Sequence, residues 1–199
     1  PPLDLLLRIF LEAVVDLLEQ AGVKTVFGLL GGSMLELYDA LRMSKIGYVG
    51  ARDERAAGHM ADAYARISHK VGVVTGQNGP AATLLVAGLA EALTASSPVV
   101  ALVQDTPAMF RDKNAFQELD HLELFKGCAK WIRRVEDLSR IDDYVDMAFR
   151  QATGGRPGPA VLLAPVDVME ADQAPGSDRT ESLSHYPLDR PVADPTQVA

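Results

Sequence analysis

The sequence predicts an α/β protein with a doubly wound, parallel sheet of about six strands flanked by helices. Two observations favour this class. Short apolar runs alternate with longer helical patterns along most of the chain, which is typical of βαβ units. Two of these runs, at 71–75 and 98–103, are almost entirely apolar. Such continuous runs are expected where helices cover both faces of a sheet.

The first element is expected to be an amphipathic helix from Leu3 to Ala21. Charged side chains recur about every four residues along it and form one polar stripe. A membrane-spanning helix needs roughly 20 mostly apolar residues, and the apolar part of a signal peptide is uninterrupted. The pattern therefore predicts no membrane partner, and we expect a cytoplasmic protein.

Alternating strands and helices follow this first helix. The strands are expected at 25–28, 46–51, 71–75, 98–103, 129–135 and 159–164. The helices between them are expected at 33–42, 54–66, 79–96, 116–125 and 138–152. In the helix at 33–42, the side chains available for burial are Leu35, Leu37, Tyr38 and Leu41. These elements assign residues 1–170 to one domain.

Residues 171–199 have a different composition. Four prolines stand among Asp, Ser, Gln and Thr, with little apolar periodicity, which is typical of a linker. The segment is either a free tail or the connection from this domain to the rest of a longer protein. The second reading is the one we expect.

Charge and cysteine content exclude some functions. A net charge of -8 without a basic cluster argues against a nucleic-acid partner. Cys128 is the only cysteine, so an intrachain disulfide is impossible and a reducing compartment is expected. The four histidines lack metal-ligand spacing with each other or with Cys128. We therefore assign no metal to these residues.

Glu54 is the carboxylate placed best for chemistry. A short strand-like run ends at Ala51, and a helix rich in Ala and Gly begins after the triplet Arg52-Asp53-Glu54. Glu54 is thus expected at the carboxyl end of a strand and in the first turn of a helix. Ligands bind at that edge in open α/β sheets. The alternative is an acid that only complements the helix dipole.

Two glycine-containing turns also follow strands. In GQNGPAAT at 76–83, Asn78 or Gly79 can cap the next helix, and Pro80 suits its first position. The turn GLLGGS at 28–33 resembles a phosphate loop only superficially, because it lacks the full GxGxxG spacing and a Walker lysine. Each turn could also be an ordinary connection between a strand and a helix.

Five motifs in order carry a family resemblance: VFGLLGGS at 26–33, RDE at 52–54, ADAYAR at 61–66, GQNGP at 76–80 and GRPGP at 155–159. Together they resemble the amino-terminal pyrimidine-binding domain of thiamine diphosphate enzymes, in particular the acetolactate synthase and 2-oxo acid decarboxylase group. The resemblance covers about residues 10–170. It implies the thiamine diphosphate-binding fold, with 171–199 leading toward an absent middle domain.

The resemblance also implies roles for single residues. Glu54 takes the position of the family's catalytic glutamate, which hydrogen-bonds N1′ of the aminopyrimidine and promotes loss of the thiazolium C2 proton. The cofactor-binding residues implied with it are Leu30, Gly31, Asn78, Gly79 and Pro80.

A second set of residues is implied in the substrate channel. NAFQE at 114–118 resembles a Phe-Gln-Glu segment of the acetolactate synthase branch, and Lys130-Trp131 matches a Lys–aromatic pair that follows it. Phe116, Gln117 and Lys130 are therefore expected to line that channel. The alternative is a surface loop with a buried phenylalanine.

The implied function is that of one domain of a thiamine diphosphate-dependent lyase or transferase, which cleaves or forms C–C bonds on 2-oxo acids. The chain alone is expected to be inactive. The resemblance implies that the diphosphate is held through Mg²⁺ by a Gly-Asp-Gly segment of a separate domain. This sequence contains no Gly-Asp-Gly segment, so Mg²⁺ and the diphosphate are expected on an absent domain. A homodimer or homotetramer is implied, because the family's site lies between subunits. The alternatives are the small subunit of a split decarboxylase and a non-catalytic flavodoxin-like binding module.

Overall fold

The computed structural model describes residues 3–169, and the side chains of all of these except 3–11 and Ser33. The expected linker at 171–199 lies outside the described residues. Six strands form one parallel sheet in the order β2-β1-β3-β4-β6-β5. They are β1 (Thr25–Gly28), β2 (Gly47–Gly50), β3 (Gly72–Gly76), β4 (Val99–Asp105), β5 (Trp131–Arg134) and β6 (Ala160–Pro165).

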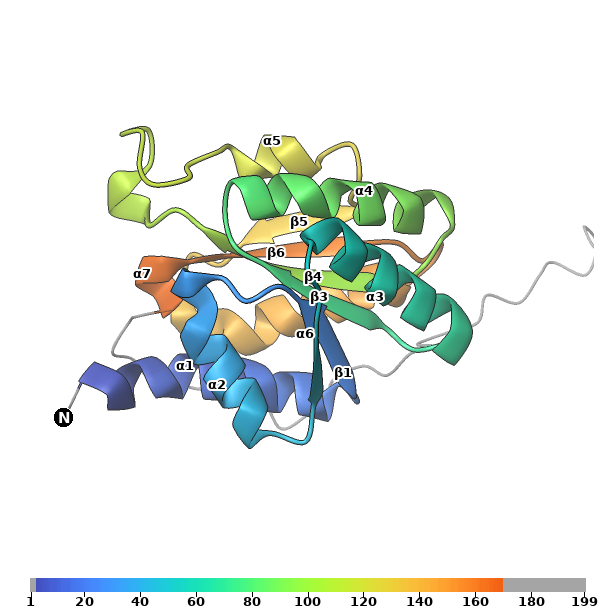
Figure 1. Ribbon diagram of the computed structural model, residues 1–199, viewed down its shortest axis with the longest axis horizontal. Helices are drawn as coiled ribbons and strands as arrows, with labels where there is room; N and C mark the ends of the chain where they lie inside the picture. The colour runs from blue at the N-terminus through green and yellow to red at the C-terminus, as the bar shows by residue number, and fades with distance from the viewer. Residues whose placement is uncertain (1–2, 170–199) are drawn as a thin grey trace, which may run out of the picture.

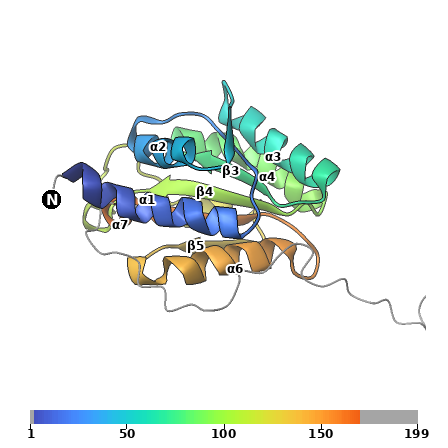
Figure 2. The ribbon, with the colours of Figure 1, turned by 90° about the horizontal axis from the view of Figure 1, so that it is seen from below.

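Helices cover both faces of this sheet. The α-helices are α1 (Leu3–Gln20), α2 (Leu35–Met43), α3 (Glu54–Ser68), α4 (Pro80–Thr94), α5 (His121–Phe125), α6 (Ile141–Thr153) and α7 (Val166–Met169). Short 3₁₀ turns form η1 (Gly32–Met34), η2 (Ala108–Phe110) and η3 (Leu138–Arg140). Figure 1 shows α4 and α5 above the sheet and α1, α2 and α6 below it. Figure 2 shows α1 beside α6 on the lower face. The predicted doubly wound parallel sheet is confirmed.

The central strands are buried on both faces, as their apolar runs predict. In β4, Val100 and Leu102 pack into the lower core, between the sheet and α1, α2 and α6. Val99, Ala101 and Val103 pack into the upper core, between the sheet and α3 and α4. Every residue of β3 and β4 is buried. Alternate side chains thus enter different cores, and both cores need apolar residues.

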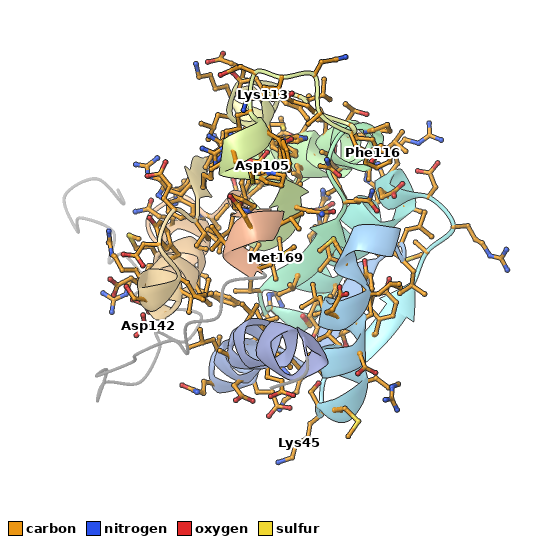
Figure 3. All side chains as sticks on the ribbon, turned by 90° about the vertical axis from the view of Figure 1, so that its left-hand side faces the viewer. Lys45, Asp105, Lys113, Phe116, Asp142 and Met169 are labelled. Atoms are coloured by element: carbon orange, nitrogen blue, oxygen red, sulfur yellow. The ribbon has the colours of Figure 1, made fainter. Side chains whose placement is uncertain are left out.

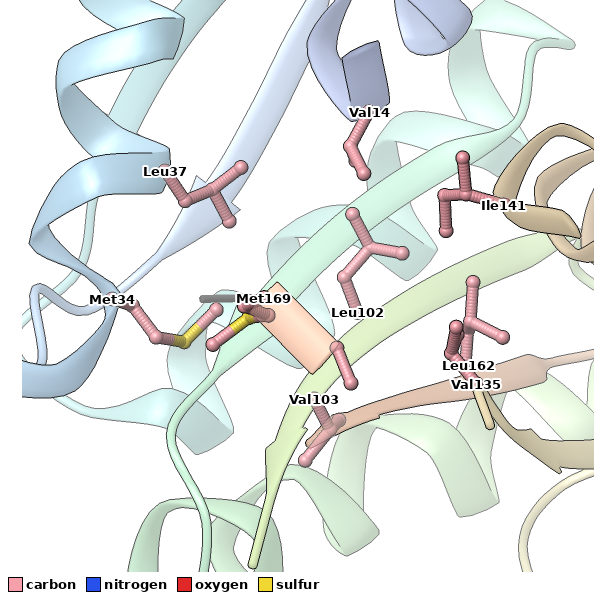
Figure 4. Close-up of a pocket in the computed structure, with 10 residues that line it drawn as sticks. Val14, Met34, Leu37, Leu102, Val103, Val135, Ile141, Leu162 and Met169 are labelled. Carbon is pink, nitrogen blue, oxygen red and sulfur yellow. The ribbon is translucent and has the colours of Figure 1, made fainter. Parts of the chain in front are cut away.

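A small cavity lies in the lower core (Figure 4). Only apolar residues line it, and they come from both the sheet and the helices: Val14, Met34, Leu37, Leu102, Val103, Val135, Ile141, Leu162, Ala164 and Met169. A polar ligand would find no side-chain hydrogen-bond partner there. The cavity is therefore part of the core packing.

Two details of the sequence prediction are wrong. The helix expected at 116–125 begins only at His121, because Gln117 adopts a positive φ of 53° and Asp120 caps the helix by accepting from the Glu123 N–H. Leu35, which was expected in the core, is 55% exposed because it starts α2 on its outer side.

Within residues 3–169, no helix is both long and apolar enough to cross a membrane.

The small residues of α3 and α4 let these two helices pack in close contact. A Cβ atom added to Gly88 would lie 2.5 Å from the carbonyl carbon of Gly58. Arg66 of α3 also pairs with Glu91 of α4 at 2.7 Å. The close helix packing that the sequence allows is therefore used within the chain.

We predict that Gly88→Ala destabilises the fold. Alanine favours a helix by up to about 1 kcal/mol, but its Cβ would collide with backbone atoms, and overpacking costs about 1–3 kcal/mol. The free energy of unfolding, measured with urea, should therefore fall. Gly127→Ala is the control, because nothing lies within 4 Å of a Cβ there. Equal stability of the two variants would show that the contact between α3 and α4 is loose.

Candidate functional site at the carboxyl edge of the sheet

The connections that follow β1 and β3 lead to opposite faces of the sheet. The chain leaves β1 for the edge strand β2 and then returns to place β3 on the other side of β1. Helix α2, after β1, packs in the lower core, whereas α4, after β3, packs in the upper core. The two connections therefore diverge at the carboxyl ends of these strands, which is where ligands bind in such sheets. Figure 3 looks onto this edge, with Asp105 and Phe116 labelled.

Glu54 is buried at this edge. It is the first residue of α3, and the Asp53 carboxylate caps the helix by accepting from the Arg55 N–H at 2.8 Å. Glu54 is 8% exposed, and its side chain forms no hydrogen bond or ion pair with the side chains that the structure describes. The helix N-terminus stabilises a negative charge there. A buried carboxylate without a partner is otherwise costly, so the low exposure of Glu54 needs an explanation, which the helix N-terminus supplies in part.

Two tyrosines stand close to Glu54. Tyr38 donates a hydrogen bond to the Leu29 carbonyl at 2.8 Å, and its ring centroid lies 4.9 Å from that of Tyr48. Burial raises the pKa of both phenols, and the negative charge of Glu54 adds to the rise. Both phenols therefore stay protonated at neutral pH.

The turn after β3 has a conformation that glycine permits. Gly79 caps α4 with φ +61° and ψ −119°, and an added Cβ would lie 2.6 Å from the Gln117 carbonyl oxygen. Pro80 takes the first helical position, as predicted. Asn78 does not cap the helix. Its amide donates instead to the carbonyl oxygens of Phe116 at 3.0 Å and Gln117 at 3.4 Å.

Side-chain contacts join the three predicted loops. The Gln77 amide donates to Gln117 Oε1 at 2.9 Å. On its other side Gln77 packs against Gly31, where an added Cβ would lie 2.3 Å from Gln77 Oε1. Leu30 and Phe116 are 57% and 74% exposed at the rim. The structure therefore brings together the segments around residues 30, 78 and 117.

Lys130 does not lie with these residues. It precedes β5 at the amino edge of the parallel sheet, opposite to Glu54. Its ammonium donates to the carbonyl oxygens of Gln151 at 2.6 Å and Gly154 at 2.5 Å, at the C-terminus of α6. Burial lowers the pKa of this lysine. A cation is stabilised at a helix C-terminus, and this contact accounts for its position.

Sequence reasoning missed a buried group beneath the turn at Gly79. His121 Nδ1 lies 2.7 Å from Asp105 Oδ1, and Arg134 pairs with the other carboxylate oxygen. Burial alone would raise the pKa of Asp105, but the hydrogen bonds with His121 and Arg134 outweigh it and hold the pKa below its usual value. The signal available in the sequence was a polar pair, Gln104-Asp105, that ends an apolar strand.

The sequence matches a known domain family. Residues 10–124 match the thiamine pyrophosphate enzyme, N-terminal TPP binding domain. Among residues 3–169, no cluster of three or more His, Cys, Asp or Glu side chains could hold a metal ion.

Several relatives are named as acetolactate synthases. A probable acetolactate synthase large subunit from Methanocaldococcus jannaschii is 42% identical over 161 residues, which cover 81% of this chain and 27% of the relative. One from Methanococcus aeolicus is 39% identical over 191 residues, covering 94% and 32%. The acetolactate synthase isozyme 2 large subunit of Escherichia coli is 40% identical over 158 residues, covering 79% and 29%.

The matched part thus spans about a third or less of the length of these relatives. The family match covers more than half of this chain, and it includes Glu54 and the turns around Gly31 and Gly79. The chain therefore belongs to the thiamine pyrophosphate enzymes and carries their N-terminal TPP binding domain.

Proposed function

We propose that this chain is the pyrimidine-binding domain of an acetolactate synthase-like enzyme, which cleaves or forms C–C bonds on 2-oxo acids with thiamine diphosphate. One observation carries the proposal: Glu54 is buried at the carboxyl edge of the sheet without a described hydrogen-bond partner. The names of the relatives support the reaction class. The comparisons favour neither the split subunit nor the flavodoxin-like module.

The described residues fit an aminopyrimidine ring. Such a ring is flat, carries hydrogen-bonding nitrogens and needs close approach by the backbone. Glu54 offers a carboxylate, and Asn78 Oδ1 is a buried acceptor with no hydrogen-bond partner among the described residues. Gly31 and Gly79 bring the backbone close to neighbouring groups without a side chain. We infer that these four residues hold the ring, with Leu30 and Pro80 as apolar walls.

The proposed chemistry assigns one proton transfer to this chain. When bound, thiamine diphosphate supplies a nucleophilic carbon and an electron sink for bonds next to a carbonyl. Glu54 would bind N1′ of the pyrimidine and would exchange a proton with that atom. Tyr38 and Tyr48, whose pKa values are raised, stay protonated and do not compete for that proton. The Asp53 cap holds the first turn of α3 and so orients the Glu54 side chain.

The rim residues are proposed to meet the 2-oxo acid. Phe116 projects at the same edge of the sheet in Figure 3 and offers an exposed apolar face. The Gln117 side chain is held by Gln77, which fixes one polar group beside it. Lys130 is left out of this proposed channel, because it lies at the opposite edge of the sheet.

We propose that the rest of the site comes from outside this chain. Mg²⁺ and the diphosphate would be held by another domain, and the active protein would be a homodimer or homotetramer. The inner faces of α3 and α4 pack on each other, so a two-fold contact would use outer residues such as Met60 and Ile67, which are 39% and 81% exposed. A cytoplasmic location is supported by the single cysteine, a buried thiol.

Glu54→Gln is expected to slow proton exchange at C2 of the bound cofactor in the complete enzyme. Proton transfer by a positioned group contributes about 10²–10⁴-fold, whereas a lost first-turn charge costs only about 0.3–1 kcal/mol of stability. The exchange of C2–H for deuterium, followed by NMR, measures the effect. Asp53→Asn is the matched control, because it removes the adjacent charge and keeps a cap. An unchanged exchange rate in Glu54→Gln would refute the catalytic role.

The purified 199-residue chain is expected to bind thiamine diphosphate weakly and to turn over no pyruvate. The reason is that the groups for Mg²⁺ and the diphosphate are proposed to lie elsewhere. Calorimetric titration and a decarboxylation assay test this, with the complete enzyme as the reference. Clear turnover by the chain alone would contradict the division of the site.

The chain is also expected to associate as a dimer through the outer faces of α3 and α4. Light scattering at high micromolar concentration should give twice the chain mass. Ile67→Glu should shift the equilibrium toward monomer, since it places a charge on an apolar contact. Lys70→Glu, a change of an exposed residue beyond the end of α3, is the control. A monomeric wild-type chain would contradict this assembly.

A further inference from the structure

A buried polar group lies directly beneath the proposed cofactor turn. The side chains of His121 and Asp105 are 0% and 1% exposed. They come from α5 and from the end of β4. Arg134 of β5 completes the group and is 16% exposed. The proposed proton transfer uses none of these three residues, so their burial needs a separate explanation.

The hydrogen bonds assign the tautomer of His121. The Gly79 N–H donates to His121 Nε2 at 2.9 Å, and a backbone N–H can only donate, so Nε2 carries no proton. In the neutral ring the proton is therefore on Nδ1, which donates to Asp105 Oδ1 at 2.7 Å. The same oxygen accepts from the Thr106 N–H at 2.9 Å. Asp105 thereby fixes both the orientation and the tautomer of the imidazole.

The imidazole supplies the partner that the Gly79 N–H requires. Gly79 is the N-cap of α4, so its N–H is outside the hydrogen-bond ladder of that helix. It is buried, and a buried N–H without a partner destabilises its conformation. The contacts of Gln77 and Asn78 tie the same turn to the loop at 116–117 from the rim. His121 supports the turn from the core.

We propose that His121 is a positioning residue of the cofactor site, oriented by Asp105 and Arg134. Its Nε2 atom fixes the peptide between Asn78 and Gly79, and this peptide sets the shape of the wall that faces the aminopyrimidine. The identity of the ligand rests on the proposed function. The tautomer and the contact with Gly79 rest on the geometry alone.

Two substitutions separate positioning from general support of the core. In His121→Gln, the amide oxygen can reach the place of Nε2 and accept from the Gly79 N–H. In His121→Asn, the shorter amide can reach Asp105 but not Gly79. Both variants remove the ring and leave a polar amide in its place. Thr153→Val is the control, because it deletes another buried hydrogen bond, from the Thr153 hydroxyl to the Phe149 carbonyl at 2.8 Å in α6.

The first measurements use the 199-residue chain. Imidazole ¹⁵N shifts should show His121 as the neutral Nδ1–H tautomer, and the Gly79 amide should be protected from hydrogen exchange. Loss of one hydrogen bond predicts about tenfold faster exchange at Gly79 in His121→Asn. The rate in His121→Gln should stay close to wild type. Thr153→Val should lower global stability without changing the local opening at Gly79.

The second measurement uses the complete enzyme. His121→Asn should raise the KM for thiamine diphosphate and slow C2–H/D exchange, and His121→Gln should restore both toward wild type. Equal effects of the two variants would overturn the proposal, as would an Nε2–H tautomer or an unprotected Gly79 amide. The tautomer is measured in the unmodified chain. The proposal can therefore be refuted even when a variant fails to fold. Absence of C2 exchange in the wild-type enzyme would instead refute the proposed function.

Discussion

The parallel pairing of β1 with β3 is the constraint on which the site depends. It places the carboxyl ends of these strands side by side, with Gly28 opposite Thr75. The following connections lead to helices in different cores and therefore separate. The approach is close, since a Cβ on Gly28 would lie 2.3 Å from Thr75 Oγ1. Strands any farther apart would not bring Gly31 against Gln77.

The strands and the position of Glu54 could be predicted because their signals are local. A continuous apolar run such as 98–103 is required by burial on both faces, and no distant residue is needed to recognise it. Glu54 follows a strand directly and precedes a helix rich in small residues, so its place at the sheet edge follows from chain order.

The loop between β4 and α5 could not be predicted, because distant residues decide its shape. Asn114 and Gln117 adopt positive φ angles of 54° and 53°, which L-residues rarely adopt. Helical periodicity favoured a helix from residue 116. The contacts of Gln117 with Gln77 and Asn78 join residues about 40 positions apart and hold the backbone in another conformation. Periodicity in the local sequence carries no information about such distant partners.

Lys130 illustrates the same limit at a single residue. A motif match placed it in the channel, although the strand expected at 129–135 already puts Lys130 at its amino end, away from the carboxyl edge of the sheet. Lys130 precedes β5, and the carbonyl groups at the end of α6 fix its ammonium. Arg134, at the other end of the same strand, reaches the site edge through Asp105.

The three supports of the turn at Gly79 act from different directions. Gln77 and Asn78 bind the exposed loop, and Pro80 begins α4. His121 contacts the turn from inside the core, through a carboxylate that is itself paired with Arg134. Rim contacts alone would let the turn follow the loop that carries the exposed Phe116. The core contact anchors the turn separately, so the turn that we propose to face the cofactor does not depend on the loop alone for its shape.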